Sequence, residues 1–223
     1  MRSITYLGHT CFQVRLGNVA MLFNPAVSDS VAGKTRGEKS GLNYHAVREC
    51  DLILLSNEGP WNCEPEVVKE ISERCFSSVV APRPALSKIS LSDRFKIDVR
   101  VGDKFSVKGV DIEVVKAVHP QAQYPVGYVV KGDGLSVYHA GDTYSFTDMG
   151  RIKCDVALVP IGGGGTMDPF AANSSIKEMR PKVAVPMAYN THEGIRQDAS
   201  EFTSDLGGLT KGVALRIGQE MRL

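Results

Sequence analysis

The sequence lacks an excess of charge of either sign. Lysine and arginine together number 26, and aspartate and glutamate 25, so the formal net charge is +1. A strongly basic chain would attract nucleic acid or an anionic membrane, and this balance favours neither. We therefore expect no nucleic-acid partner and no membrane partner.

Paired cysteines and long apolar runs are also missing. The five cysteines are odd in number and widely spread, and none forms a C-x-x-C pair. This pattern indicates neither a disulfide framework nor a zinc knuckle, and a reducing compartment fits it best. No apolar run approaches ~18 residues, and the chain starts in strand-like alternation without the apolar core of a signal peptide. We expect a soluble, cytoplasmic protein.

The first half of the chain contains short apolar segments. Residues 4–7, 11–16 and 19–23 are typical of strands, and Gly17-Asn18 is a good tight-turn pair between the last two. Residues 25–45 are polar, glycine-rich and without periodicity, so we expect a long loop over one end of a sheet.

A strand, a polar connection and a helix follow. Residues 51–55 form an apolar run, and apolar residues recur at helical spacing from Pro65 onward. Proline suits the first turn of a helix because its missing N–H has no partner there in any case. Residues 56–64 therefore connect a strand to a helix, and residues 78–81 predict the next strand.

The second half contains β-type segments first and alternating strands and helices later. Several segments between Phe95 and Ala140 are separated by glycine turns, which predicts a second antiparallel sheet. Buried-type strands are expected at 155–161, 182–187 and 213–217, and helices at 168–179 and 200–206.

This order of elements predicts an α/β (α+β) fold. Two mixed sheets that each bury one face on the other need helices over their outer faces, which gives a four-layer αββα sandwich. A chain of 223 residues without a linker or repeat can form this as one domain, residues 1–223.

Several motifs in the chain resemble the metallo-β-lactamase superfamily. They include ITYLGHTCF at the start, SVYHAGDT, and DVALVPIGGGGTMDPFAA, and together they cover nearly the whole chain. Within that superfamily the chain is similar to small metal-dependent hydrolases such as ascorbate 6-phosphate lactonase-like proteins. The resemblance implies the same αββα fold and a chemistry in which metal-activated water attacks an ester, lactone or phosphoester.

The resemblance also identifies seven metal-ligand positions. In the family the connection after the central strand reads T-H-x-H-x-D-H, and further ligands follow in later segments. Five of the matching residues here cannot bind as the family's ligands do, whereas His119 and Asp142 can. The five replaced positions are Asn57, Gly59, Trp61, Asn62 and Ala188. A catalytic zinc needs about three protein ligands, so we expect no metal cofactor and only a remnant of the cleft.

The replaced ligand positions have lost negative charge together with the metal ions. Buried carboxylates that lost their cations would repel one another. Here Asn24 and Trp61 are neutral where the family has aspartates, so Asp142 alone stays acidic and His119 becomes its counter-charge. We expect Trp61 to fill the volume left by the metals and its N–H to find an acceptor.

The other histidines have weaker assignments. We expect His9 and His139 to lie near the site and to hydrogen-bond the framework, and His45 to be a loop residue. His192, four residues after Ala188, is a candidate substitute ligand. On sequence alone, His119 also fits an ordinary capping residue and Asp142 an ordinary turn residue.

Two further features of the sequence are weak signals. Residues 162–165 are four glycines before an expected helix, which fits either a phosphate cradle or a flexible turn at the rim of a cleft. Ser56, Thr143 and Cys63 are potential nucleophiles, but none lies in a recognisable nucleophile elbow.

Three hypotheses remain from the sequence. The first is a protein of this fold that has lost both metals and binds a small phosphorylated or carboxylated ligand or a protein partner, with a homo-oligomer left open. The second is a hydrolase with one zinc or manganese ion held by His119 and Asp142 together with His192, His9 or His139. The third, a structural subunit beside an active paralogue, has no positive evidence.

Overall fold

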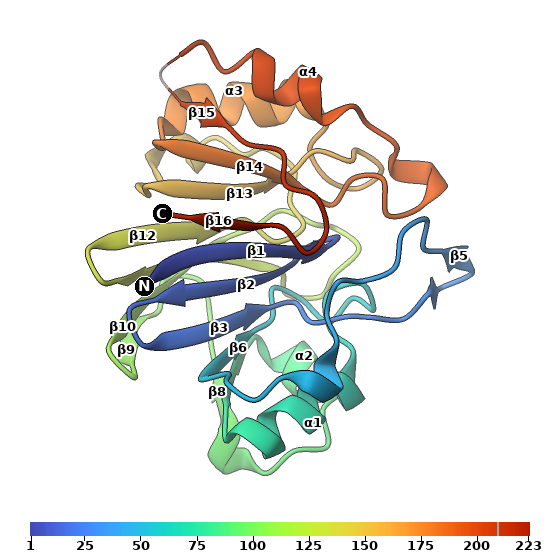
Figure 1. The fold of residues 1–223 in the computed structure, drawn as a ribbon, viewed down its shortest axis with the longest axis vertical. Helices are drawn as coiled ribbons and strands as arrows, with labels where there is room; N and C mark the ends of the chain where they lie inside the picture. The colour runs from blue at the N-terminus through green and yellow to red at the C-terminus, as the bar shows by residue number, and fades with distance from the viewer. Residues whose placement is uncertain (209) are drawn as a thin grey trace.

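Two seven-stranded sheets form the centre of the molecule in the computed structural model, which describes residues 1–208 and 210–223 (Figure 1). The first sheet has the strand order β16-β1-β2-β3-β6-β7-β8. Its strands are β1 Arg2–Gly8, β2 Cys11–Leu16, β3 Val19–Phe23, β6 Leu52–Leu54, β7 Ser78–Ala81, β8 Lys96–Asp98 and β16 Glu220–Arg222. Pairing of β16 with β1 brings the two ends of the chain together.

The second sheet has the order β15-β14-β13-β12-β11-β10-β9. Its strands are β9 Lys104–Val107, β10 Val110–Lys116, β11 Val126–Gly132, β12 Leu135–His139, β13 Val156–Pro160, β14 Val183–Met187 and β15 Lys211–Gly212. The strands from β9 to β12 pair antiparallel, and those from β12 to β15 pair parallel. Both sheets are therefore mixed.

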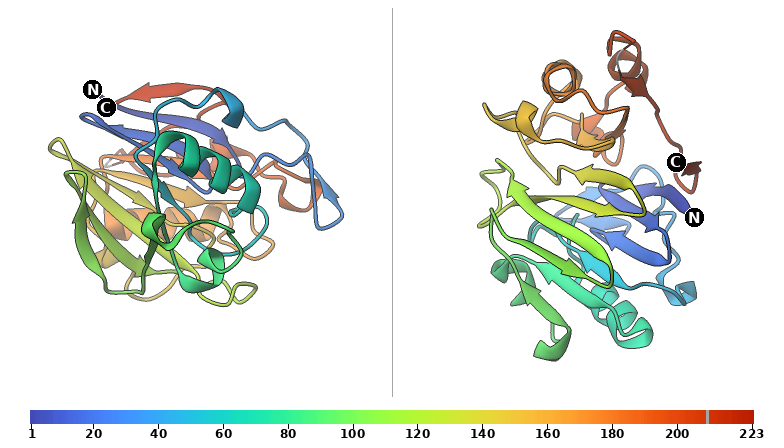
Figure 2. Two further views of the ribbon diagram at one scale, coloured as in Figure 1. Left: turned by 90° about the horizontal axis from the view of Figure 1, so that it is seen from below. Right: turned by 90° about the vertical axis from the view of Figure 1, so that its left-hand side faces the viewer.

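Helices cover the outer faces of both sheets. Figures 1 and 2 show α1 Pro65–Cys75 and α2 Arg83–Leu86 on the first sheet, and α3 Pro169–Met179 and α4 Ala199–Ser204 on the second. Four short 3-10 helices lie in the connections: η1 Tyr44–Ala46, η2 Asp93–Phe95, η3 Met149–Arg151 and η4 Glu193–Ile195. The predicted four-layer αββα sandwich is confirmed.

The two long helices begin as their sequences predict. Helix α1 has Pro65 at its first position, and Phe76 ends it in a left-handed conformation. Helix α3 starts after Asp168, whose carboxylate accepts a hydrogen bond of 2.8 Å from the backbone N–H of Ala171. This cap satisfies one of the free N–H groups of the first turn.

Strand β6 shows how the apolar sequence divides between two cores. Leu52 and Leu54 pack into the core between the sheets, whereas Ile53 and Leu55 pack into the core under α1 and α2. Successive side chains of a strand point to opposite faces, so a strand covered on both sides is apolar throughout. Burial on both faces explains the continuous apolar run of this segment.

Three expectations from the sequence need correction. Residues 213–217 contain no strand, and only Leu215 among them is buried, because the chain leaves the sheet after the two-residue β15. The segment that begins at Phe95 supplies β8, which pairs parallel with β7 in the first sheet and not in the second. The loop of residues 25–45 contains a small hairpin of β4 Ser30–Val31 and β5 Lys34–Thr35.

Among the residues that the structure describes, no helix combines the length and the apolar character needed to cross a membrane. The five cysteines are free thiols. Of these, Cys11, Cys50 and Cys63 are buried, which places them with the apolar side chains of the core.

Tyr128 on β11 ties the two sheets together. Its ring is fully buried, and its hydroxyl donates a hydrogen bond of 2.7 Å to the carbonyl of Leu55, which follows β6 in the other sheet. We expect Tyr128→Phe to lower the free energy of unfolding by about 1–2 kcal/mol, because a buried carbonyl loses its donor. Urea denaturation measures this change. Tyr144→Phe, at a half-exposed ring, is the matched control, and an equal loss in both variants would contradict the assignment.

Candidate functional site

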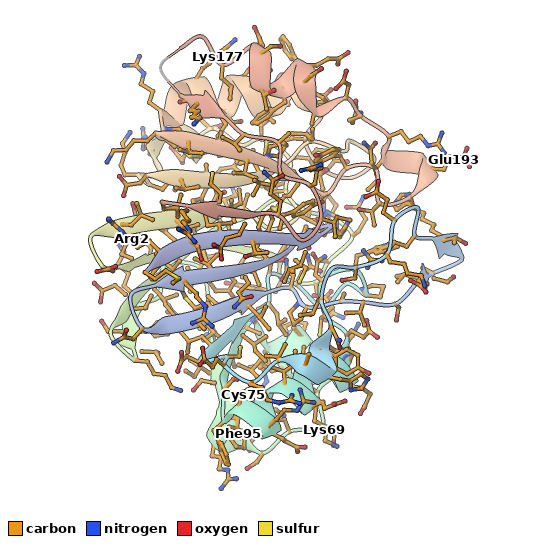
Figure 3. The ribbon with its side chains drawn as sticks, viewed as in Figure 1. Arg2, Lys69, Cys75, Phe95, Lys177 and Glu193 are labelled. Carbon is orange, nitrogen blue, oxygen red and sulfur yellow. The ribbon has the colours of Figure 1, made fainter. Side chains whose placement is uncertain are left out.

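The candidate site lies at one edge of the sandwich, where strands of the same direction end. In the first sheet β1, β3 and β6 run the same way, and in the second sheet β10, β12, β13 and β14 do. The connections after these strands carry the predicted site residues. In Figure 3 Glu193 on η4 lies on the side of the molecule to which the β4–β5 hairpin also extends, so loops from both sheets meet there.

All seven positions identified from the sequence line a single cavity of about 270 Å³. They are Asn57, Gly59, Trp61, Asn62, His119, Asp142 and Ala188. The cavity walls also include His9, His192 and the glycines Gly163, Gly164 and Gly165. Ala32 and Lys34 reach the cavity from the hairpin, as expected for a long loop that covers a site.

The carboxylate of Asp142 is held by amide groups. Its Oδ2 accepts a hydrogen bond of 2.6 Å from Nδ2 of Asn62 and a longer one of 3.4 Å from Nδ2 of Asn57. Oδ1 of Asn57 in turn accepts from the amide of Asn62 at 3.2 Å and from the backbone N–H of Gly59 at 2.7 Å. These residues, where the family resemblance would place metal ligands, therefore bond to one another.

A second layer of hydrogen bonds fixes Asn62 from behind. Its Oδ1 accepts from the hydroxyl of Thr10 at 2.5 Å and from Nδ2 of Asn24 at 3.1 Å. Asn24 also accepts from the backbone N–H of Ser56 at 2.8 Å. Because both oxygen and nitrogen of Asn62 have partners, its Nδ2 must point at Asp142.

His119 approaches Asp142 from the second sheet. Its Nδ1 lies 3.0 Å from the carbonyl oxygen of Gly165, which can only accept, so Nδ1 carries a proton. Its Nε2 lies 4.0 Å from Oδ2 of Asp142. This distance is too long for a direct hydrogen bond, and an ion pair forms only when the imidazole is protonated.

Trp61 forms one wall of the cavity. Its ring packs against His9 and His192, with centroid separations of 5.2 and 5.6 Å, and the Arg36 guanidinium lies 5.0 Å from the ring centroid. The expectation that Trp61 fills the site is wrong, because a cavity of about 270 Å³ remains beside it. The predicted acceptor is also missing: within residues 1–208 and 210–223 no hydrogen bond from its indole N–H is found.

The backbone around the cavity is unusual. His9, Asn24 and Ala188 have φ values of 55°, 46° and 53°, in the left-handed region that costs a non-glycine residue free energy. Gly162 approaches Ala188 so closely that an added Cβ would lie 2.1 Å from its carbonyl oxygen. Left-handed conformations of this kind cluster at functional sites, where the surrounding structure maintains them.

The remaining histidines have structural partners. Nε2 of His139 lies 2.9 Å from the Thr10 carbonyl, and its Nδ1 accepts from the N–H of Gly141. His9 pairs with the hydroxyl of Thr191 at 3.0 Å, and burial lowers the pKa of both His9 and His139 to about 4. Both are neutral at pH 7, as expected for framework histidines.

His192 and His45 lie apart from the Asp142 network. Nδ1 of His192 accepts from the backbone N–H of Gly194 at the start of η4, and burial lowers its pKa. Its ring lines the cavity against Trp61. His45 is exposed beside Glu70, as expected for a residue outside the site, but it lies in the short 3-10 helix η1 and not in a loop.

The three potential nucleophiles have framework roles. The hydroxyl of Ser56 accepts from Asn24, and that of Thr143 accepts from the N–H of Val118 and donates to the Tyr144 carbonyl. Burial raises the pKa of Cys63 to about 12, so its thiol stays protonated. None of the three has the neighbouring base that would activate it.

The side chains around the cavity do not fit the dinuclear centre implied by the resemblance. Among the residues described, no three His, Cys, Asp or Glu side chains are arranged to hold a metal ion. His119 and Asp142 remain as two candidate ligands, fewer than the three protein ligands usual for a catalytic zinc.

Sequence reasoning missed several contributors to this site. Thr10 lies in the opening motif but had no assigned role, and Lys34 lies in the polar loop; the fold brings Thr10 to Asn62 and Lys34 to the cavity. Arg36 was also missed, although it is buried behind Trp61, because an arginine in a polar loop gives no signal of burial.

Comparisons with known proteins agree with this architecture. Residues 3–188 match the family model of the β-lactamase superfamily domain. A UPF0173 metal-dependent hydrolase of Thermococcus kodakarensis is 33% identical over an alignment of 236 positions that covers 100% of both chains. Another, from Thermoplasma acidophilum, is 31% identical and covers 92% of this chain and 90% of its own.

A solved structure is similar over the same length. Igni18, described as a novel metallo hydrolase from Ignicoccus hospitalis, superposes with a TM-score of 0.84 at 28% identity. The match covers 100% of this chain and 98% of that one.

The buried neutral histidines should make stability depend on pH. The pKa of His139 is about 4 in the folded chain against 6.5 as its ordinary value, so between these pH values the unfolded chain binds more protons. The free energy of unfolding should therefore fall as pH drops from 6.5 to 4, by up to ~1.4 kcal/mol per pH unit for each such histidine. Urea denaturation across this range should give a shallower slope for His139→Gln than for the wild type.

His45→Gln, which removes an exposed imidazole, is the control for stability at pH 7. Equal slopes for the wild type and His139→Gln would show that His139 takes up its proton as readily in the folded chain as in the unfolded one.

Proposed function

The chain belongs to the β-lactamase superfamily domain family, and from that premise we propose that it is a member whose metal centre has been replaced by a metal-free hydrogen-bond network. Its cavity then acts by binding a small ligand and not by activating water. The family relatives are named metal-dependent hydrolases, and the proposed change concerns the site alone.

One observation carries this proposal: the amides of Asn62 and Asn57 bond to the Asp142 carboxylate. A carboxylate at a metal site is balanced by the cation. Here amide N–H groups provide that balance, and they are themselves held by Thr10 and Asn24. A metal ion that bound Oδ2 of Asp142 would have to displace these amide N–H groups.

The cavity walls support a small-molecule ligand with an apolar part and a charged or polar group. Trp61 offers an aromatic face, and His119 offers a ring nitrogen close to Asp142. Lys34 brings a positive charge to the rim, so an anionic group of the ligand is expected to lie near it.

A second candidate is a hydrolase with one metal ion at His119 and Asp142. The relatives are named metal-dependent hydrolases, which favours it, and Nε2 of His119 lies 4.0 Å from the carboxylate. The proposal above has more support because the third ligand is missing among the described side chains.

Metal analysis separates the two candidates. We expect protein purified from medium with added zinc or manganese to hold well under one equivalent, because two candidate ligands bind weakly. Elemental mass spectrometry after dialysis measures the content. One tightly held equivalent that His119→Ala abolishes, and that the exposed His45→Ala retains, would refute the metal-free proposal and favour the hydrolase.

Restoring the family's ligands tests whether the five replaced positions are correctly assigned. We expect metal binding to return when Asn57→His, Gly59→His, Trp61→Asp, Asn62→His and Ala188→His are combined. Gly59→His alone is the matched control and should lose stability, because a Cβ at Gly59 would lie 2.6 Å from Oδ1 of Asn57. A combined variant that folds, by circular dichroism, but binds no zinc by calorimetry would contradict the assignment of these positions.

A further inference from the structure

A second cavity lies beside the first and shares only His9 with it. Its volume is about 310 Å³. It is enclosed by the end of β1, the loop after β5, the loop after β14 and the segment before β16, which approach one another in Figure 1. Its lining includes Tyr6, Arg36, Glu38, Thr191, Arg216 and Ile217.

Arg36 is the buried charge of this cavity. The residue is only 7% exposed. Its Nε donates to the carbonyl of Ser28 at 3.1 Å, and its Nη2 donates to the carbonyl of Ala26 at 3.3 Å. Its Nη1 is buried without any hydrogen-bond partner. The guanidinium is thus fixed on one side and unsatisfied on the other.

The free nitrogen lies next to residues of the cavity wall. A Cβ added to Gly8 would lie 3.3 Å from Cδ1 of Ile217, a lining residue, and 3.8 Å from Nη1 of Arg36. Gly8 itself has a φ of +104°, so glycine is needed there for the backbone as well. Nη1 therefore lies near Gly8 and Ile217, and Arg36 is itself one of the lining residues of the cavity.

Arg36 forms no direct ion pair within the described part of the chain. Asp29 and Glu64 act on Arg36 by their charge and oppose the lowering of its pKa by burial, but neither forms an ion pair with it among the described residues. Glu38 on the cavity wall is exposed to solvent. Burial raises the pKa of the Cys11 thiol to about 12 and that of the Tyr6 phenol above its ordinary value, so neither is an anion at pH 7. Burial correspondingly lowers the pKa of Arg36.

An unpaired buried cation is costly, and an anion that enters beside it repays that cost. We propose that the cavity at Arg36 binds a small anion through a phosphate or carboxylate group, which accepts a hydrogen bond from Nη1. Arg216 on the rim adds a second positive charge, and the hydroxyl of Thr191 lies on the same wall. This site is separate from the one in the proposed function and does not depend on it.

Trp61 provides a direct readout. It is the only tryptophan of the chain, and the Arg36 guanidinium lies 5.0 Å from its ring centroid. An anion bound to Arg36 adds a negative charge close to the Trp61 ring. Phosphate should therefore change the fluorescence of Trp61, and the change should saturate as the phosphate concentration rises. Calorimetry supplies an independent dissociation constant at constant ionic strength.

The variants separate this site from its neighbour. Arg36→Met keeps the length of the side chain and removes the charge, and we expect it to raise the dissociation constant for phosphate by about tenfold or more. Glu38→Gln should tighten binding, because it removes a like charge from the wall. Arg216→Gln should weaken binding less than Arg36→Met. Acetate, titrated in parallel, distinguishes a carboxylate site from a phosphate site.

Three results would overturn the proposal. The first is that the wild type binds neither anion saturably. The second is that Arg36→Met binds phosphate with the wild-type dissociation constant. The third is that Lys34→Met, in the other cavity, abolishes phosphate binding. Should Arg36→Met fail to fold, unchanged affinity in both Glu38→Gln and Arg216→Gln would overturn it equally.

Discussion

The hydrogen bond from Asn62 to Asp142 is the interaction on which the candidate site depends. Asp142 is 7% exposed, and a buried carboxylate needs either a cation or several donors around it. The amide of Asn62 supplies a donor at 2.6 Å, and Asn57 supplies a weaker one. The carboxylate of Asp142 therefore has hydrogen-bond donors from the protein itself, beside the open volume of the cavity.

The fold explains how these amides come to lie beside Asp142. The connections that follow parallel strands meet at one edge of the sandwich, so Asn24, Asn62 and Asp142 arrive there from three different strands. Hydrogen bonds from Thr10 and Asn24 then fix the orientation of Asn62. Pre-organisation of this kind means that the network costs little entropy, since each amide is already held by the framework.

Local periodicity predicted the layers and most of the strands. The family resemblance of the ordered motifs identified the seven positions that line the cavity. Sequence patterns failed where long-range pairing decides the outcome. Residues 213–217 have strand composition, yet β15 ends before them, and β8 joins the first sheet although the strands that follow it along the chain form the second. The open cavity beside Trp61 was also unpredictable, because the volume that a side chain leaves empty depends on every wall around it.

The two cavities differ in charge, and the wall between them is neutral. His9 borders both, and the nearby carboxylate of Asp142 raises its pKa while Arg36 lowers it. Burial decides the balance and keeps the imidazole uncharged, with Trp61 packed against it. Because neutral His9 carries no charge to balance either Asp142 or Arg36, each of these two charged groups needs a partner within its own cavity. The chain compensates Asp142 with its own amides, whereas at Arg36 it provides carbonyl groups for two nitrogens and leaves the third for an anion.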